Sequence, residues 1–478
     1  MFQLPLSKRT VGVVTRKDAK MAAGYTLFNA SRETYLIDED GQLVHQWRSC
    51  RNVFTSYLLP SGNLLRDGTV ALHSPGFQVG GAGGVVEEVD WDNRQVWVFD
   101  FYPYQQTLAH HDLEPLANGH VLVMVWERKT KQQALDAGRR PDLIADEGIW
   151  NDLIIELKPE GSSATRVWQW SMWDHLIQDF CPSLPHFGDV SAHPELFDIN
   201  ICPVAGKGAQ RNKTLAQEGM DKNCLGLAFW KQPGKTGEKD WLHINSISHD
   251  PVRDQIALGL HNAGEVVIID HSTTTQEASS HEGGQRGKGG DILYRFGNPA
   301  MCRQGTLADQ FLFCSHHAVF IRGAPGEGNV LIFNNGRAPD RLFSTVEEYE
   351  LADSHGNFSP YTGPQAPVWS YGEPCGKYGS FYCTHISGAR RLVNGNTLVI
   401  MGPQGILFEI TPEGEEVWRY INPVQADCEH YVAAVRQGDF RAEGKFSLFT
   451  AMRYERSYPG LLQDGKPRQL QSGRYLEA

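Results

Sequence analysis

The chain has 478 residues, a hydrophobic content of 41% and a formal net charge of −12. This length and hydrophobic content are sufficient for a large buried core. The acidic balance is scattered, and without a concentrated basic surface we expect no nucleic-acid partner. No apolar run reaches the roughly 18 residues of a membrane helix, so we expect no membrane partner either.

The N-terminal region and the cysteines predict the cellular compartment. Residues 1–9 contain no apolar stretch of signal-peptide length. The nine cysteines include no close CxxC pair, which is typical of buried thiols in a reducing compartment. We therefore expect a cytoplasmic protein without a disulfide framework, and the sequence leaves its oligomeric state open.

A short aromatic pattern recurs along the chain and is the strongest signal of its fold. Each copy alternates with a period of two residues, which is the period of a β-strand. Self-similar units at long intervals indicate a repeat architecture, and in an all-β chain they most naturally close into a ring of blades. We therefore predict an all-β, six-bladed β-propeller with long loop insertions. The copies are Val44–Trp47, Val96–Phe99, Val167–Trp170, Leu293–Phe296, Val368–Tyr371 and Val417–Tyr420.

Asn-Gly and Gly-Asn turns separate the predicted strands, as at Asn394-Gly395-Asn396. Three segments interrupt this rhythm and are predicted to be insertions into a single domain that spans 1–478. They lie at approximately 127–150, 182–240 and 273–290. We expect Phe446–Phe449 to form the last strand and to close the ring against the N-terminal segment.

Histidines occupy the start of the innermost predicted strand in four units. They are His110–His111, His243, His316–His317 and His385. Equivalent positions of a propeller lie at the same depth around its central channel, so these rings should meet on the axis. His261 follows the strand 255–260 and should return beside His243. Because adjacent strand residues point oppositely, only one histidine of each pair should face the axis, and we favour His111 and His316.

Several neutral imidazoles that converge on one point suit a transition metal, with copper or iron expected and zinc as a further option. The first hypothesis is therefore a metal-dependent enzyme, of oxidoreductase or lyase type, that acts on a small substrate, with an aromatic molecule as one option. Its metal ligands would be His111, His243, His261, His316 and His385. Asn245 lies two residues after His243 and could donate a hydrogen bond to a substrate oxygen.

Further motifs resemble the bacterial arylsulfate sulfotransferase family across nearly the whole chain. They are Gly24–Phe28, Thr34–Asp38, Tyr57–Pro60, His110–Asp112, Trp241–Ser246, Ile332–Gly336, Arg453–Tyr454 and Tyr458–Gly460. The resemblance implies a six-bladed propeller. It also implies the metal-free transfer of a sulfuryl group from an aryl sulfate to a phenol through an axial histidine.

By this resemblance, His316 falls on the position of the nucleophile, which would carry the sulfuryl group as a sulfohistidine. His243, Asn245 and a histidine of the 110–111 pair match the residues that bind the sulfuryl oxygens, and His110 is a substrate-binding candidate. The family has an arginine where this chain has His261 and a small hydroxyl residue where it has His385. Arg337 or Arg390 would then supply the cation, without any cofactor.

Three functions remain open from the sequence: a metalloenzyme, a sulfotransferase with His316, His243 and Asn245 as catalytic residues, and a propeller that only binds partners. The histidine group argues against the third, because a scaffold does not need it.

Overall fold

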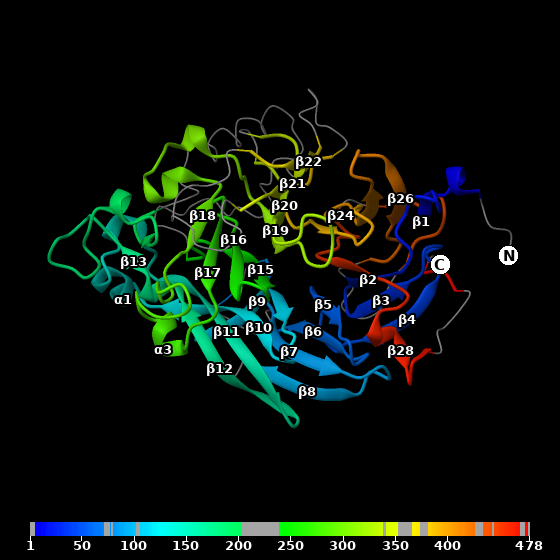
Figure 1. Ribbon diagram of the computed structural model, residues 1–478, viewed down its shortest axis with the longest axis horizontal. Coiled ribbons are helices and arrows are strands. Elements are labelled where there is room, and N and C mark those ends of the chain that lie inside the picture. Colours follow the sequence, from blue (N-terminus) through cyan, green and yellow to red (C-terminus); the bar gives the residue numbers. More distant parts are fainter. Residues whose placement is uncertain are drawn as a thin grey trace.

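The computed structural model describes residues 5–70, 77, 80–101, 106–201, 239–337, 341–351, 366–372, 381–425, 434–441, 444–468 and 474–476. Strands dominate these residues, and six sheets of four or five strands surround a common centre (Figure 1). The predicted six-bladed propeller is confirmed. Within this described part of the chain, no helix has the length and apolar character needed to cross a membrane.

Each blade is an antiparallel sheet in which, with two exceptions, neighbouring strands follow one another along the chain. Blade one holds β27 (Ala451–Tyr454), β2 (Tyr25–Ala30), β3 (Glu33–Ile37) and β4 (Leu43–Arg48). Blade two holds β5 (Ser56–Leu58), β6 (Leu64–Thr69), β7 (Gly84–Val89) and β8 (Gln95–Asp100). Blade three holds β9 (Thr107–Pro115), β10 (Val121–Lys129), β11 (Ile149–Glu160) and β12 (Ser163–Ser171). Blade four holds β15 (Ile244–Asp250), β16 (Gln255–Leu260), β17 (Glu265–Asp270) and β18 (Tyr294–Phe296). Blade five holds β19 (His316–Phe320), β20 (Val330–Asn334), β21 (Thr345–Tyr349) and β22 (Trp369–Tyr371). Blade six holds β23 (Gly388–Arg391), β24 (Thr397–Met401), β25 (Ile406–Ile410), β26 (Glu416–Ile421) and β1 (Gly12–Arg16). The exceptions are the pairing of β27 with β2 in blade one and that of β1 with β26 in blade six.

The recurring aromatic pattern lies on the fourth strand of each blade, namely β4, β8, β12, β18, β22 and β26. Figure 1 shows β8 and β12 at the periphery, and the first strands β5, β9, β15 and β19 near the centre. Alternate residues of the pattern face the neighbouring blade, so Trp47, Trp97, Trp170 and Trp418 are almost fully buried. These buried tryptophans therefore pack between neighbouring blades in the outer part of the ring.

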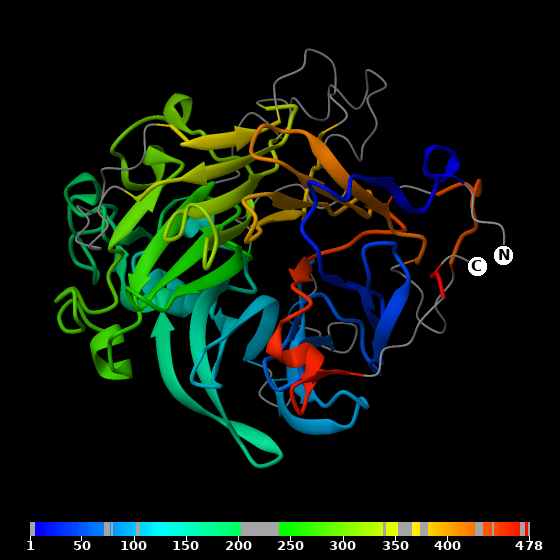
Figure 2. The same cartoon turned by 45° about the vertical axis from the view of Figure 1, so that its right-hand side comes forward.

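The two chain ends close the ring in separate blades. β27 pairs with β2 through Tyr25–Tyr454 and Phe28–Ala451, whereas β1 adds a fifth strand to β26. Figure 2 shows the blue N-terminal and red C-terminal segments side by side in this part of the ring. The prediction of a last strand at Phe446–Phe449 is wrong. Phe446 and Leu448 are buried, as the alternation predicts, but the segment does not pair with a strand. Instead, the N–H of Leu448 donates to the carbonyl of Gly402, and the carbonyl of Phe446 accepts from the side chain of Asn422.

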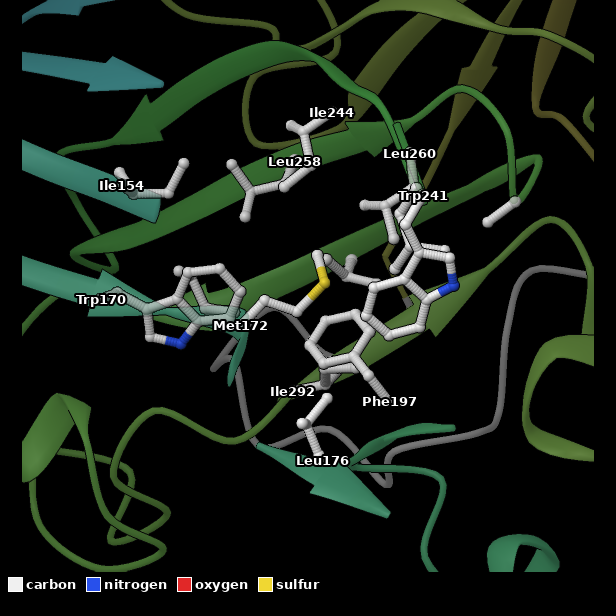
Figure 3. Packing of buried hydrophobic residues seen from close by; sticks show 14 of the residues in the cluster. Ile154, Trp170, Met172, Leu176, Phe197, Trp241, Ile244, Leu258, Leu260 and Ile292 are labelled. Atoms are coloured by element: carbon white, nitrogen blue, oxygen red, sulfur yellow. The ribbon is translucent and has the colours of Figure 1, made fainter. Parts of the chain in front are cut away.

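The largest hydrophobic cluster fills the contact between blades three and four, with Ile154, Trp170 and Met172 on one side and Ile244 and Leu258 on the other (Figure 3). Trp241 joins this cluster, and both Trp241 and Ile244 are buried. They flank His243 on both sides in the sequence. Burial of the flanking side chains therefore holds the backbone of His243 at the inner end of β15.

The predicted insertions contain the short remaining elements. Segment 127–150 includes α1 (Lys131–Asp136) and η4 (Pro141–Leu143), but its ends belong to β10 and β11. Segment 182–240 includes η6 (Val190–Ala192) and β14 (Phe197–Asp198), which pairs with β13 (Leu176–Ile177), and 202–238 lies outside the described residues. Segment 273–290 includes α3 (Thr275–Ala278). Other short elements are η1 (Leu6–Lys8), η5 (Met172–Asp174), η7 (Pro299–Cys302), η8 (Leu307–Asp309), η9 (Pro459–Leu461), β28 (Leu462–Gln463) and β29 (Lys466–Pro467).

Candidate active site

The innermost strands of three blades are irregular at the axial histidines. The pairing register shifts between β9 and β10, between β15 and β16, and between β19 and β20. At these places His111, His243 and His317 have φ values of 53°, 55° and 55°. Left-handed backbone is uncommon for residues other than glycine, and such bulges often re-aim side chains at functional sites. The chain therefore accepts local strain at two members of the axial group, His111 and His243, and at His317 next to His316.

Four imidazoles from three blades form a continuous row. Ring centroids lie 4.5 Å apart for His111 and His243, 5.2 Å for His243 and His261, and 5.0 Å for His261 and His316. His385, from blade six, is close enough to influence the pKa values of His261 and His316. The structure thus brings together all five predicted metal-ligand candidates.

His110 also faces this group. Its Nδ1 lies 3.0 Å from Nδ1 of His111, its ring stacks on Trp126 at 4.1 Å, and its Nε2 is 3.3 Å from Oδ1 of Asp152. The premise that adjacent residues point oppositely does not hold at the 110–111 pair, because the two rings touch each other; which of them faces the axis stays a prediction. The left-handed backbone at His111 breaks the alternation of side chains that a regular strand would impose.

Hydrogen bonds fix the tautomer of His316. Its Nδ1–H donates to Oδ1 of Asn335 at 2.8 Å and to the carbonyl of Cys314 at 3.0 Å. The Asn335 amide donates to the carbonyls of Cys383 and Ile386, both at 2.9 Å, so its oxygen must face His316. Nε2 of His316 therefore carries the lone pair, which accepts a hydrogen bond from the backbone N–H of Ile386 at 3.2 Å.

The other rings are oriented through Nδ1 as well. Nδ1 of His243 lies 2.5 Å from Oδ2 of Asp240. Nδ1 of His261 lies 2.9 Å from Oδ1 of Asn262, and Nδ1 of His385 lies 2.8 Å from the hydroxyl of Thr384. A carboxylate on the far side of an imidazole stabilises its protonated form, so His243 differs chemically from its neighbours.

Burial keeps the other rings neutral. It lowers the pKa of His261 to about 3, with further lowering by His243, and lowers the pKa of His385 to about 4. Burial, and then the neighbouring imidazoles, also hold the pKa values of His111 and His316 well below the ordinary range. A neutral imidazole is a nucleophile or a metal ligand, but it cannot neutralise a sulfate.

Two of the predicted polar residues, Asn245 and Arg337, lie beside this row. The Asn245 amide donates to the carbonyl of Ser315 at 2.8 Å, and its buried Oδ1 has no hydrogen-bond partner among the described residues. The Arg337 guanidinium lies 5.4 Å from the ring centroid of Phe313, and its charge contributes to lowering the pKa of His261. Arg390 lies 5.8 Å from the ring centroid of Tyr57. Burial raises the pKa of Asp112, and the charge of Arg390 acts in the opposite direction.

The predicted metal site has a limited geometric basis. In the described part of the chain, two groups of three side chains bring their ligand atoms within 4.8 Å of one another, and neither contains an axial histidine. The axial rings also meet edge to face or tilted, with interplanar angles of 80°, 59° and 72° along the row. Their Nδ1 atoms at His243, His261 and His316 already have protein partners. The axial metal stays a prediction.

Sequence reasoning missed the residues that orient the rings. Asp240 precedes His243 by three residues, Asn335 lies in a motif noted only for its resemblance, and Trp126 and Asp152 are distant in the chain. Nothing in the local pattern identifies Trp126 or Asp152, because their contacts with His110 depend on how the strands of blade three pair.

The fold and the row of buried imidazoles define a propeller with a histidine site on its axis. The family model described as Arylsulfotransferase (ASST) matches residues 10–431, and the chain belongs to this family. The family indicates that the protein is an enzyme. The comparison with curated proteins gives no match.

Several solved structures are similar to this chain. One is a protein of unknown function from Bacteroides caccae, with 12% identity, a TM-score of 0.42, and coverage of 84% of this chain and 94% of that chain. Another is the β-propeller domain of Cps50 (Swd1) from Myceliophteria thermophila, with 11% identity, a TM-score of 0.38, and coverage of 89% and 96%. A streptogramin B lyase gives 9% identity, a TM-score of 0.33, and coverage of 77% and 68%.

Proposed function

We propose that the protein transfers a sulfuryl group from an aryl sulfate to a phenolic acceptor through a sulfohistidine on His316. The supporting observation is the hydrogen bond from Nδ1 of His316 to Asn335, which leaves the lone pair on Nε2 of a buried, neutral ring. Membership of the arylsulfotransferase family supports the same chemistry. A positioned imidazole whose other nitrogen is held by a partner is a standard arrangement for nucleophilic catalysis.

In the first half-reaction, Nε2 of His316 attacks sulfur and the bond from sulfur to the aryl oxygen breaks. The phenolate leaves with that electron pair and takes a proton from His243, whose imidazolium form is stabilised by Asp240. In the second half-reaction, the acceptor hydroxyl attacks sulfur, the N–S bond breaks, and the electron pair returns to Nε2. The acceptor proton passes to His243, so both residues return to their starting states.

The sulfuryl oxygens need donors in this scheme. The backbone N–H of Ile386 donates to Nε2 of His316 at 3.2 Å; this bond would break when Nε2 attacks sulfur, and the freed N–H would then be a donor for a sulfuryl oxygen. His110 and Asn245 are further candidates, and Arg337 would supply the fixed positive charge because His261, with a pKa of about 3, stays neutral. The substrate would be a small molecule that reaches the axis.

The test is a sulfuryl-transfer assay with 4-nitrophenyl sulfate as donor and phenol as acceptor. We expect release of 4-nitrophenol, and a protein adduct of one sulfuryl mass that accumulates without acceptor. The variant His316→Ala should lose both, whereas His193→Ala, which removes an exposed histidine, should keep both. Undiminished release by a folded His316→Ala variant would refute the assignment of the nucleophile.

The alternative from the sequence is a copper, iron or zinc centre held by His111, His243, His261, His316 and His385. The convergence of these rings supports it, but their edge-to-face contacts favour it less than sulfuryl transfer. Elemental analysis of protein purified without a histidine tag tests it, since a metal bound on the axis should be lost in His385→Gln.

A further inference from the structure

A second group of histidines lies at the far end of the same inner strand. His243 directly precedes β15, whereas His249 is near its end and Asp254 lies in the turn that follows. At about 3.3 Å per residue, the two ends of this strand are roughly 20 Å apart. This second group is therefore separate from the row of axial imidazoles.

Three side chains of this group converge on one point. Oδ1 of Asp254 accepts hydrogen bonds from Nε2 of His249 at 2.9 Å and from Nδ1 of His271 at 2.7 Å. Each of the three side chains offers one ligand atom, and these ligand atoms all lie within 4.8 Å of one another. In a tetrahedral zinc site with bonds of 2.0–2.2 Å, ligand atoms are about 3.4 Å apart, so only small side-chain movements would admit the ion.

The backbone is built to hold this convergence. Asp254 has a left-handed conformation with φ of 51°, and its carbonyl accepts the N–H of His271 at 3.0 Å. The ring of His271 also lies against Trp168 of blade three, with centroids 4.9 Å apart. The carboxylate and the ring of His271 are thus fixed relative to each other by covalent geometry, a backbone bond and packing.

A further carboxylate completes the arrangement. Nε2 of His271 donates to Oε2 of Glu156 at 3.1 Å, and the other oxygen of Glu156 is hydrogen-bonded to His120. Histidines that bind metals almost always donate their second ring nitrogen to a carboxylate or carbonyl, which orients the ring. Glu156 stands in that position, on β11 of the neighbouring blade.

The environment also allows an ion to enter. The Asp254 side chain is 37% exposed, while those of His249 and His271 are each 11% exposed. The other group of this kind, His175, His281 and Asp291, is less suitable. His175 is wholly buried and stacked on Trp170, and the side chain of His281 is 60% exposed.

We propose that His249, Asp254 and His271 bind one Zn²⁺ ion, with water as the fourth ligand and Glu156 as the partner of His271. Two imidazoles and a carboxylate favour zinc over calcium or magnesium, which prefer oxygen ligands alone. All three ligands belong to blade four, on the side of the ring away from the axial histidines, and Glu156 would connect this site to blade three through its hydrogen bond with His271.

The experiment titrates Zn²⁺ into protein that carries no histidine tag and has been stripped with EDTA and dialysed. Calorimetry and elemental analysis give the number of ions bound, and thermal unfolding gives a second readout. We expect one equivalent to be lost in Asp254→Asn but kept in His281→Asn and His385→Gln. Wild-type protein should also unfold at a temperature several degrees higher with zinc than without it.

A variant outside the ligand set keeps the test decisive if Asp254→Asn fails to fold. Glu156→Gln retains all three ligands, and we expect it to bind the same equivalent about 10-fold more weakly. An affinity in Glu156→Gln equal to that of wild type would overturn the proposal. So would the absence of zinc binding by wild-type protein, or full retention of bound zinc in folded Asp254→Asn.

Discussion

In protein stripped of metal, His271 should make stability depend strongly on pH. Burial acts to lower the pKa of His271, but its hydrogen bonds to Asp254 and Glu156 outweigh burial and raise the pKa to about 9. In the unfolded chain the pKa of a histidine is about 6.5. The folded protein therefore binds the His271 proton more tightly than the unfolded chain does.

The magnitude follows from the difference of about 2.5 pKa units, at 1.36 kcal/mol for each unit. The interaction of protonated His271 with its carboxylates therefore stabilises the folded state by about 3 kcal/mol. This single free energy covers His271 and its carboxylates together. Because the folded pKa is the higher one, this stability is fully present below about pH 6.5. It is lost as the pH rises toward about 9.

The assay is equilibrium unfolding in urea, with EDTA present, between about pH 6 and pH 10. We compare the free energy of unfolding of wild type with that of His271→Gln at each pH. The advantage of wild type should be about 3 kcal/mol larger at the acid end of this range than at the alkaline end. The control His193→Gln, at an exposed position, should show the same pH dependence as wild type. A constant difference between wild type and His271→Gln across this range would refute the reasoning.

Three further predictions concern the site and the core. Asn335→Leu should lower kcat for sulfuryl transfer about 100-fold because the tautomer of His316 is no longer fixed; a kcat close to wild type would contradict this. Arg337→Gln should raise KM for an aryl sulfate about 10-fold, with partial rescue by Arg337→Lys in the same steady-state assay. Glu265→Gln should cost about 3–5 kcal/mol in urea unfolding, since it leaves Arg295 buried without its carboxylate; a cost below about 1 kcal/mol would count against it.

The sequence was sufficient to predict the ring and the number of its blades. The aromatic pattern and the Asn-Gly turns are local signals, because strand period and turn geometry depend on neighbouring residues. Closure was harder to predict. Ala451–Tyr454 pairs with a strand more than 400 residues away in the chain, and β1 joins blade six, so neither end carries a local signature of its partner.

The sequence predicted those residues of the candidate site that lie at equivalent positions of the repeat or next to them. Aligning the units by their turns assigns four of its histidines to one repeat-equivalent position, and the return of His261 beside His243 follows from the hairpin of β15 and β16. The contact between the rings of His110 and His111 depends on a bulge that the sequence does not predict. The convergence of His249, Asp254 and His271 was also missed, because it depends on the order of strands within blade four.

Because β27 completes blade one, the blades become complete in a defined order during synthesis of the chain. Residues 451–454 leave the ribosome after every other strand of the six blades, so β2 has an unpaired edge until then. An open edge is a template for pairing with other chains, and domains fold largely as they emerge. Five blades can therefore assemble early, while the first blade to be translated is the last to be completed.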